Sequence, residues 1–429
     1  MIKALWLCNI IIPEFSDIYG IKKNPYGGWI SGMLDALSTE SDIEVAFLFP
    51  VRDSSRKKHG EYGRYKFFSF DDGISDKSKV SKERISFFSD VLEEYEPDVI
   101  HVWGTEYAWS LEMTIACKKK GILDKLLINI QGFVSICERH FFEGIPKEYI
   151  GKKIEGGKSI WDEQQDFFLR GKNEIKILKE SVNICGRTDW DKACALSVNP
   201  HLNYFHSREI IRPIFYNNAG QWKWDLCRKK SIFVSQASYP IKGFHYLIKA
   251  LYYVKRKYPQ LSVYVAGNDI TLSTDYSSYA QYIVDEIKRL QLADTIHFVG
   301  SVSAEEMVSY YRGANVFVSA SLEENSPNSV CEAMLIGVPI ISSFVGGIQT
   351  MLSHNVEGLL YPSNEPELLS MYILECFEKR DLCERLSKNA SNKAAEFVSK
   401  PKAKEELISI YKTIFQQSKV NYNKLYQPM

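Results

Sequence analysis

The length, composition and charge of the chain bound its fold and exclude several classes of function. Its 429 residues suffice for two domains, and a hydrophobic fraction of 45% is ample for two cores. The 53 basic and 53 acidic side chains cancel, whereas nucleic-acid-binding proteins usually show a strong basic excess, so we expect no nucleic acid partner.

The cysteines and the apolar segments indicate in which cellular compartment the protein is expected. Nine scattered cysteines without a C-x-x-C pair indicate reduced thiols in a cytoplasmic protein. The sequence shows neither a signal peptide nor a run of about 18 apolar residues, so we expect no membrane-spanning helix. A peripheral contact with the inner face of the membrane stays open.

Short apolar segments alternate with segments of helical periodicity through the first half of the chain. We predict strands at 3–12, 43–49, 98–103, 126–130 and 182–185, and helices at 28–38, 82–95 and 106–120. Residues 152–180 are charged and helical, and we interpret them as an addition to the first domain.

The alternation restarts in the second half. We predict strands at 231–236, 261–266, 295–299, 314–320 and 339–342, and helices at 242–258, 278–290 and 304–312. Such apolar strands, separated by helices, are typical of parallel sheets covered on both faces. We therefore expect an α/β fold with two Rossmann-like domains, 1–218 and 231–400. The polar, Trp-rich segment 216–230 is interpreted as a linker, and a last helix at 402–417 could pack back on the first domain.

A strand–loop–helix unit in the second half carries the strongest functional signal. Glu324 lies on the loop, and Glu332 lies in the helix about one and a half turns further on. Ser326 is expected to cap this helix, with Pro327 in its first turn, and Gly337 is expected to end it. A helix start binds anions, and carboxylates accept hydrogen bonds from hydroxyl groups. Phosphate plus vicinal hydroxyls describes a nucleotide sugar, and the alternative is a solvated surface loop.

Lys242 is the next candidate. It lies at a predicted helix start after a strand, where a cation is unfavourable against the helix dipole unless an anion lies nearby. We interpret it as a contact for a diphosphate, and the alternative is a surface lysine beside a turn.

The strand ends of the first half supply further candidates. Gly27 and Gly28 would let the backbone approach a ligand at a helix start, although a plain tight turn would need them equally. His101, Trp103 and Gln131 lie at the ends of two strands and would face the same sheet edge. A histidine there could position an acceptor or take a proton, or could simply be packed in its strand.

Asp189 and Asp191 form an Asp-x-Asp triplet. Such a triplet can hold Mg²⁺ or Mn²⁺ on a diphosphate. Thr188 followed by Asp191 is equally typical of a helix N-cap with a negative first turn, which is the interpretation we favour.

Together these residues resemble the retaining glycosyltransferases of the GT-B fold known as family 4. The resemblance rests on Glu324-x7-Glu332 with the following Ala-Met and Gly-x-Pro, on Pro240-x-Lys242-Gly243, on Gly346-Gly347, on Gly27-Gly28 and on the Pro-Asp-Val-Ile-His run that ends at His101. It covers about residues 1–415 and is most specific over 231–362. It implies two domains facing a central cleft, a donor bound mainly by the second, an acceptor bound by the first, and no metal requirement.

The resemblance also implies roles for single residues. Glu332 would accept hydrogen bonds from ribose hydroxyls, Glu324 would contact the donor sugar beside its anomeric carbon, and Lys242 would neutralise the departing diphosphate. The remaining donor-binding positions are Gln236, Ser326, Asn328, Ser329, Val330, Gly300 and Ser301, with the last two near the base. The acceptor-side positions are Gly27, Gly28, His101, Trp103 and Gln131.

Three positions depart from the family's pattern. The family usually has an arginine five or six residues before the lysine, and these positions are Ala237 and Gln236 here. Neutralisation of the diphosphate would therefore rest on Lys242 and the helix start unless another cation such as Arg187 reaches in. Gln131 replaces a histidine near the reacting carbon, and an amide cannot act as a base. Gln349-Thr350 replaces a Pro-Glu pair.

The sequence therefore predicts a retaining, metal-independent glycosyltransferase of the cytoplasm. It would move a hexose-type sugar from a nucleoside diphosphate sugar to a saccharide or lipid-linked acceptor, in surface polysaccharide biosynthesis (capsule, O-antigen or exopolysaccharide). The departing phosphate would take the acceptor's proton. Two alternatives stay open: a nucleotide-sugar epimerase that uses His101, His140 or Glu138, and a donor-binding accessory protein without turnover.

Overall fold

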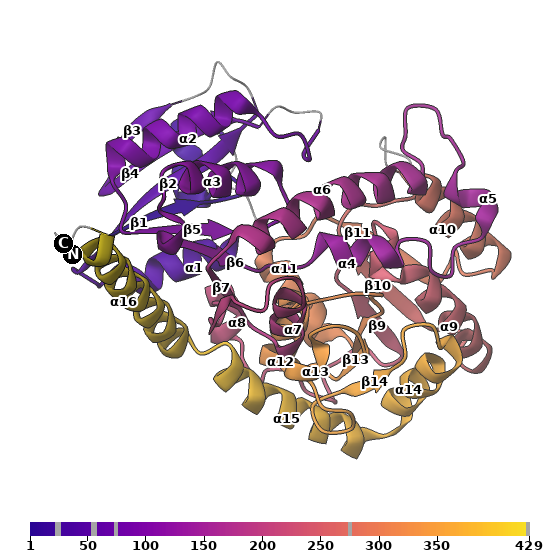
Figure 1. Ribbon diagram of the computed structural model, residues 1–429. Helices are drawn as coiled ribbons and strands as arrows, with labels where there is room; N and C mark the ends of the chain where they lie inside the picture. Colours follow the sequence, from indigo (N-terminus) through magenta and orange to yellow (C-terminus); the bar gives the residue numbers. More distant parts are fainter. Residues whose placement is uncertain (22–26, 53–57, 73–75, 273–276, 426–429) are drawn as a thin grey trace. The chain divides into compact units, whose positions relative to one another are not determined.

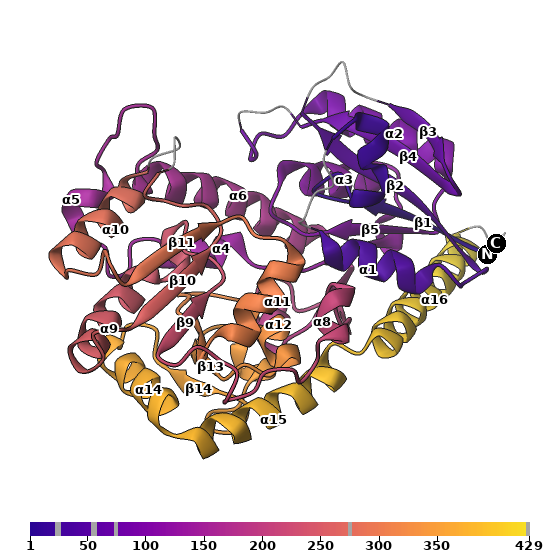
Figure 2. The same cartoon turned by 180° about the vertical axis from the view of Figure 1, so that it is seen from behind.

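The computed structural model describes residues 1–21, 27–52, 58–72, 76–272 and 277–425. The chain forms two compact units that are not continuous in sequence. The first unit comprises Met1–Ser135, Phe168–Ile210 and Ser399–Met429, and the second comprises Ile136–Phe167 and Ile211–Val398. Each unit has its own sheet, and Figures 1 and 2 show the elements from opposite sides.

The first unit is built on a mostly parallel sheet. Within the described residues its eight strands follow the order β3-β4-β2-β1-β5-β6-β7-β8, and only β3 and β4 are antiparallel. The strands are β1 (Ile2–Leu7), β2 (Ile43–Val51), β3 (His59–Tyr62), β4 (Tyr65–Asp71), β5 (Val99–Trp103), β6 (Leu126–Asn129), β7 (Asn183–Gly186) and β8 (Asn203–His206). The five predicted strands are confirmed. The mostly exposed β3 and the partly exposed β8 lack the apolar pattern that the prediction relied on, whereas β4 has buried phenylalanines and was missed by the prediction.

The helices of the first unit follow the predicted alternation with strands. They are α1 (Gly28–Leu37), α2 (Lys82–Tyr95), α3 (Ala108–Lys119), α7 (Asp189–Val198), α16 (Lys400–Leu425), the later part of α6 (Ile160–Glu180), the start of α4 (Val134–Cys137), and the 3-10 turns η1 (Pro13–Tyr19) and η3 (Leu123–Lys125). None of the helices in the described part of the chain is both long enough and apolar enough to cross a membrane.

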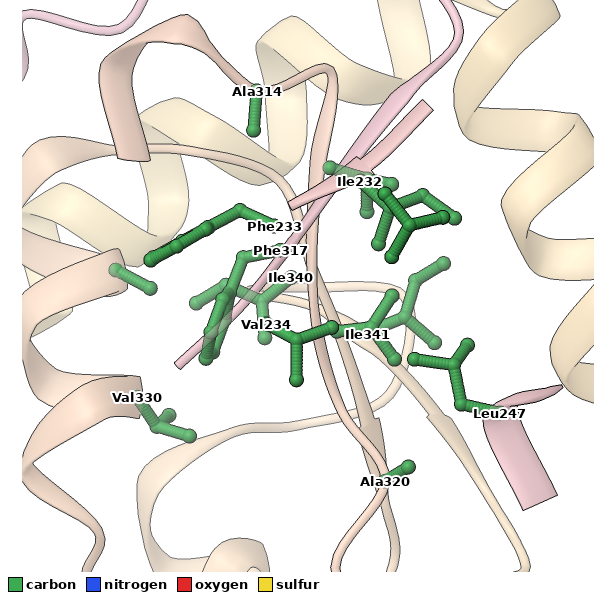
Figure 3. Close-up of a cluster of buried hydrophobic side chains, with 14 of the residues drawn as sticks. Ile232, Phe233, Val234, Leu247, Ala314, Phe317, Ala320, Val330, Ile340 and Ile341 are labelled. Atoms are coloured by element: carbon green, nitrogen blue, oxygen red, sulfur yellow. The ribbon is translucent and has the colours of Figure 1, made fainter. Parts of the chain in front are cut away.

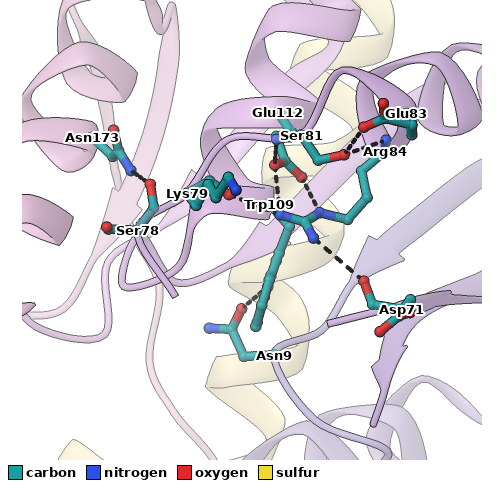
Figure 4. A network of polar contacts seen from close by, with 10 residues as sticks. All are labelled: Asn9, Asp71, Ser78, Lys79, Ser81, Glu83, Arg84, Trp109, Glu112 and Asn173. Carbon is teal, nitrogen blue, oxygen red and sulfur yellow. Dashed lines mark hydrogen bonds and ion pairs between the residues drawn. The ribbon is translucent and has the colours of Figure 1, made fainter. Parts of the chain in front are cut away.

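Helices α2 and α3 are joined by a buried ion pair. Both oxygens of Glu112, which is fully buried, accept hydrogen bonds from the Arg84 guanidinium at 2.7 and 2.8 Å (Figure 4). The backbone N–H of Ser81 donates to the same carboxylate at 2.6 Å. Because a buried charge without its partner is strongly destabilising, this pair fixes α2 against α3.

The second unit has a fully parallel sheet. Its strands in the described residues follow the order β11-β10-β9-β12-β13-β14. They are β9 (Ser231–Val234), β10 (Ser262–Ala266), β11 (Ile296–Gly300), β12 (Val316–Ser319), β13 (Ile340–Ser343) and β14 (Leu359–Tyr361). Its helices are α5 (Lys147–Ile150), α8 (Pro213–Asn217), α9 (Phe244–Lys257), α10 (Ser278–Arg289), α11 (Ala304–Gly313), α12 (Asn328–Ile336), α13 (Ile348–Met351), α14 (Pro366–Glu378) and α15 (Arg380–Phe397), with the turns η4 (Glu138–His140) and η5 (Pro240–Lys242).

The central strands of the second sheet form a dry core. Phe233 of β9, Phe317 of β12 and Ile340 of β13 are all fully buried, and Figure 3 shows them with their neighbours. Phe317 pairs with Phe233 on one side and with Ile340 on the other. Strands that are apolar on both faces need cover on both faces, which places their polar contacts at the strand ends.

Residues 136–167 pack into the second unit. Phe141 is buried in its core, and its ring centroid lies 4.8 Å from that of Phe167. The Glu143 carbonyl lies 2.9 Å from Nε2 of His245 in α9. The expected assignment of 152–180 to the first domain therefore differs from the observed division, in which α6 contributes to both units.

Segment 216–230 is also held by the second unit. The backbone N–H groups of Gly220 and Trp222 donate to carbonyls of α12, those of Leu335 and Ile336, at 2.8 and 3.0 Å. The indole N–H of Trp222 donates to Ala314 at 2.8 Å, and the ring is only 2% exposed. This segment is an integral part of the unit, because its donors and its aromatic ring are both buried there.

Candidate functional site

Helix α12 begins without a side-chain cap. The N-cap residue is Pro327, with φ −68° and ψ 126°, and its own side chain makes no capping hydrogen bond. The expected cap by Ser326 is therefore wrong: the extended ψ of Pro327 starts the helix one residue later than expected. Gly337 ends the helix in the left-handed region at φ 83°, as predicted.

The first turn of α12 keeps some of its polar groups available. Oδ1 of Asn328 is buried and has no hydrogen-bond partner among the described residues. The N–H of Val330, in contrast, already donates to Pro327 at 3.0 Å, so this expected ligand contact is taken within the protein. An uncapped helix start with an unpartnered amide oxygen is a suitable anchor for an anionic, hydroxylated ligand.

Glu324 and Lys242 form an ion pair. Nζ of Lys242 lies 2.5 Å from Oε1 of Glu324, and Ser321 Oγ donates to the same oxygen at 2.8 Å. The two charged side chains are 17% and 14% exposed. Burial alone would lower the pKa of Lys242, but Glu324 and the nearby Tyr239 raise it, so the ammonium stays charged.

Two backbone contacts hold the loops that carry this pair. Gly243 has φ 62°, and a Cβ there would overlap the carbonyl oxygen of Ala320. The Leu322 N–H donates to the Ile241 carbonyl at 2.7 Å. The glycine after Lys242 is therefore needed both for its conformation and for the close approach of the two loops.

Glu332 pairs with an arginine that sequence reasoning does not place in the site. Arg212, which precedes α8, donates to Oε1 of Glu332 from Nη2 at 2.7 Å and from Nε at 3.3 Å. The Tyr311 hydroxyl lies 3.3 Å from Oε2. Burial raises the pKa of Glu332, while Arg212 and Tyr311 oppose that shift. A carboxylate has about four acceptor positions, so these contacts leave room for a ligand hydroxyl.

The remaining donor-side candidates lie at the ends of β9 and β11. Gln236 is exposed and donates to Ser238 at 3.2 Å. Gly300 ends β11 with φ 72°, and Ser301 after it is exposed. Ser326 is 7% exposed, and the carbonyl of Ser329 accepts from Tyr311 at 3.0 Å.

His101 is a structural residue. It is fully buried in β5, its ring stacks on Trp103 at 4.1 Å, and its Nδ1 lies 2.7 Å from the Tyr411 hydroxyl of α16. Burial lowers the pKa of His101 to about 3, so the ring is neutral. The side chain lies on the packed side of its strand, which agrees with the alternative of a packed strand histidine. Trp103 is 3% exposed and equally packed, although its indole nitrogen has no partner among the described residues.

The other candidates of the first unit, Gly27, Gly28 and Gln131, have structural contacts or conformations within that unit. Gly27 has φ 92° and precedes Gly28, the first residue of α1. The start of this loop, residues 22–26, lies outside the described residues. Gln131 donates to Asn129 at 2.6 Å, and its carbonyl accepts from Arg187 at 3.2 Å. Arg187 is 5% exposed and ion-paired with Glu209 within the first unit.

The Asp-x-Asp triplet caps a helix. Thr188 accepts from the Asp191 N–H at 3.1 Å, and Asp191 accepts from the backbone of Thr188, which together form a capping box at the start of α7. The cap interpretation is confirmed. Within the described residues, no group of three His, Cys, Asp or Glu side chains is arranged to hold a metal ion.

Two acidic side chains near the sheet edges escape sequence reasoning. Glu323, beside Glu324, is 7% exposed, and burial raises its pKa to about 7. Glu106 follows β5 in the first unit and accepts from Asn9 at 3.1 Å, and burial also raises its pKa to about 7. In the sequence, only the Glu323-Glu324 doublet draws attention to Glu323, and the position of a residue in the sequence does not show that its side chain is buried.

The fold of the chain is that of the GT-B glycosyltransferases. The structure of Anabaena HepE in complex with UDP-glucose superposes with a TM-score of 0.64, at 15% identity, over 96% of this chain and 100% of that one. Residues 217–393 match the family model described as glycosyl transferases group 1. This part of the chain, which includes both acids and Lys242, is thus similar to the glycosyl transferases group 1 family.

Two curated relatives match shorter stretches. An uncharacterized glycosyltransferase of Methanocaldococcus jannaschii is 24% identical over 260 residues, which are 60% of this chain and 59% of that protein. The amylovoran biosynthesis glycosyltransferase AmsK of Erwinia amylovora is 34% identical over 89 residues, which are 19% of this chain and 22% of that protein. The chain thus spans less than two thirds of the length of either relative.

Proposed function

We propose that the protein is a retaining glycosyltransferase that moves a hexose-type sugar from a nucleoside diphosphate sugar to a saccharide or lipid-linked acceptor. The observation that carries this proposal is the pair of acids around the uncapped start of α12. Glu324 is paired with Lys242, and Glu332 is paired with Arg212. One domain thus contains an anion site at the start of α12, two carboxylates that accept hydrogen bonds from hydroxyl groups, and two fixed cations. These groups match the phosphates and hydroxyl groups of a nucleotide sugar.

Each group has a role in the proposed reaction. Glu332 accepts hydrogen bonds from ribose hydroxyls, and Glu324 lies beside the anomeric carbon. Lys242 and the α12 start stabilise the negative charge that develops on the leaving diphosphate. Arg212 is a second cation in the same domain, and we assign to it part of the role of the arginine that Gln236 replaces.

The bond changes balance without a side-chain base. The bond between the anomeric carbon and the phosphate oxygen breaks, and the acceptor oxygen bonds to the same face of that carbon. The acceptor's hydroxyl proton passes to the departing nucleoside diphosphate. The burial of His101 and the amide at Gln131 support this route, because burial disfavours the imidazolium that proton transfer to His101 would form, and an amide is not a base.

The proposal includes metal independence and a polysaccharide setting. Lys242 and Arg212 supply the positive charge that a divalent ion would otherwise bring to the diphosphate. The AmsK relative is named for amylovoran biosynthesis, which supports polysaccharide assembly. We place the reaction in the cytoplasm, with peripheral contact at the inner membrane face where the acceptor is lipid-linked.

The test compares Glu332→Gln with the matched control Glu378→Gln, which changes an exposed glutamate of α14. Thermal shifts with UDP, GDP, ADP and TDP and their sugars identify the donor first, since a bound ligand stabilises by about 2.7 kcal/mol at 100-fold over its Kd. We expect Glu332→Gln to weaken donor binding by roughly tenfold or more, because a carboxylate accepts stronger hydrogen bonds than an amide. Unchanged donor affinity and transfer would refute the site.

The same preparation separates the two alternatives. NMR of the donor without acceptor would show an isomerised sugar if the protein were an epimerase. Donor binding without transfer to any acceptor would favour an accessory protein. Of the epimerase candidates, His101 is packed in its strand and Glu138 accepts from Gln164, which leaves His140.

A further inference from the structure

A cavity lies in the second unit, next to the loop that carries Glu324. It has a volume of about 420 Å³, within the roughly 300–1,000 Å³ that is usual for small-molecule sites. It is lined by His140, Glu143, Gly144, Tyr246, Leu322, Glu323, Val345, Gly346, Ser363 and Asn364. None of these ten residues is among those assigned above to the nucleotide sugar, although Glu323 adjoins Glu324.

Glu323 is the principal polar group of this cavity. Its side chain is only 7% exposed, and what remains accessible faces the cavity that it lines. One carboxylate oxygen accepts from the Glu324 N–H at 3.0 Å. The other lies 3.7 Å from Nε2 of His140, whose Nδ1 is 2.6 Å from Glu143. A relay of three side chains thus holds one nearly buried carboxyl group toward the cavity.

Two glycines make room for this arrangement. Gly346 has φ 45°, and a Cβ there would overlap the Glu323 carboxylate. Gly144 has φ 68°, and a Cβ there would lie 2.5 Å from the Tyr246 hydroxyl. Any side chain at either position would displace a wall of the cavity, so the cavity is a built feature of the domain.

The lining restricts the chemistry of the ligand. It contains two carboxylates and no lysine or arginine, which disfavours phosphate and other anions. Carboxyl, imidazole, amide and hydroxyl groups are available for hydrogen bonds. Tyr246, Leu322 and Val345 offer apolar surface beside them. Directed polar groups next to an aromatic ring and aliphatic side chains suit a neutral ring with many hydroxyl groups.

We propose that this cavity is a carbohydrate subsite that takes one neutral sugar ring, with Glu323 bonded to its hydroxyl groups and held in place by His140. The subsite deepens the proposed function and rests on it only for the choice of sugar chemistry. The ring enters either as the sugar of the donor or as part of a separate saccharide.

The test blocks the cavity from its rim. Asn364→Trp adds bulk at an exposed lining residue, and the matched control Asn392→Trp adds it at an exposed asparagine that lines a different cavity of the domain. Saturation-transfer NMR and calorimetry use UDP, UDP-glucose and a panel of free hexoses and N-acetylhexosamines. Glu323→Ala is measured alongside, so that a misfolded tryptophan variant does not decide the result.

We expect Asn364→Trp and Glu323→Ala to weaken sugar binding by roughly tenfold or more, with UDP affinity unchanged and Asn392→Trp like the wild type. If the variants lose affinity only for UDP-glucose, the cavity binds the sugar of the donor. If they lose affinity for a free sugar that binds together with UDP-glucose, the cavity binds a separate saccharide. The inference is overturned if UDP binds but neither variant alters the affinity for any sugar. Failure of UDP, GDP, ADP and TDP alike to bind would instead count against the proposed function.

Discussion

Replacing Glu323 by glutamine isolates the free energy of ionising one buried carboxyl group. In the folded protein burial raises its pKa from 4.5 to about 7. A group whose pKa is higher in the folded state binds its proton more tightly there, so folding is favoured at low pH. Its contribution is lost as the pH rises from the unfolded pKa through the folded one.

The magnitude follows from that difference. A pKa rise of about 2.5 corresponds to about 3 kcal/mol at 1.36 kcal/mol for each pKa unit, and roughly three quarters of it falls between pH 5 and pH 8. Glutamine has nearly the same volume and does not ionise. We therefore expect the free energy of unfolding of Glu323→Gln, relative to the wild type, to increase by about 2 kcal/mol between pH 5 and pH 8.

Urea unfolding followed by circular dichroism at the two pH values measures this difference, and other titrating groups cancel between the variants. Glu378→Gln is the control without a pH-dependent effect: hydrogen bonds from Lys257 and Tyr258 lower the pKa of Glu378, so its carboxyl group is largely ionised in both the folded and the unfolded state between pH 5 and pH 8, and the relative stability of this variant should stay nearly constant. A relative stability of Glu323→Gln that stays constant, or that falls toward pH 8, would show that the carboxyl group is not desolvated as described.

Three further substitutions test the site and its support. Lys242→Met should leave the circular dichroism spectrum unchanged and reduce transfer by roughly 100-fold or more, and transfer at the wild-type rate would remove Lys242 from the mechanism. Gly243→Ala should lower the free energy of unfolding by about 2 kcal/mol or more, since it combines a strained φ with overlap at Ala320, and urea midpoints would show it. Tyr411→Phe removes the acceptor of the buried Trp6 indole N–H, so a loss of about 1–3 kcal/mol is expected in the same assay, and a neutral result would mean that Trp6 finds another partner.

The fold could be predicted largely from periodicity, because the buried parallel strands are short apolar runs and the helices between them show the matching pattern. Strand β3 is mostly exposed, so it has no such apolar run and could not be recognised from its pattern. At the site, the acids Glu324 and Glu332 could be found from the strand, loop and helix that carry them.

Contacts between distant positions could not be predicted in this way. Arg212 reaches Glu332 across 120 residues, and His140 reaches Glu323 only because residues 136–167 pack into the second unit. Similarly, the pattern that puts His101 in a strand does not decide which face of the sheet its ring meets. Only packing against Tyr411 settles that its ring is buried.

The attachment of segment 216–230 determines how the second unit could be dissected. A fragment that starts at residue 231, where the predicted domain begins, would lose the two backbone hydrogen bonds to the end of α12 and would uncover the core facing Trp222. The end of α12 would then fray close to the Glu332 carboxylate. A fragment used for ligand studies should therefore include residues 211–230, and it needs residues 136–167 as a second, tethered or co-expressed piece to keep the carbohydrate subsite closed.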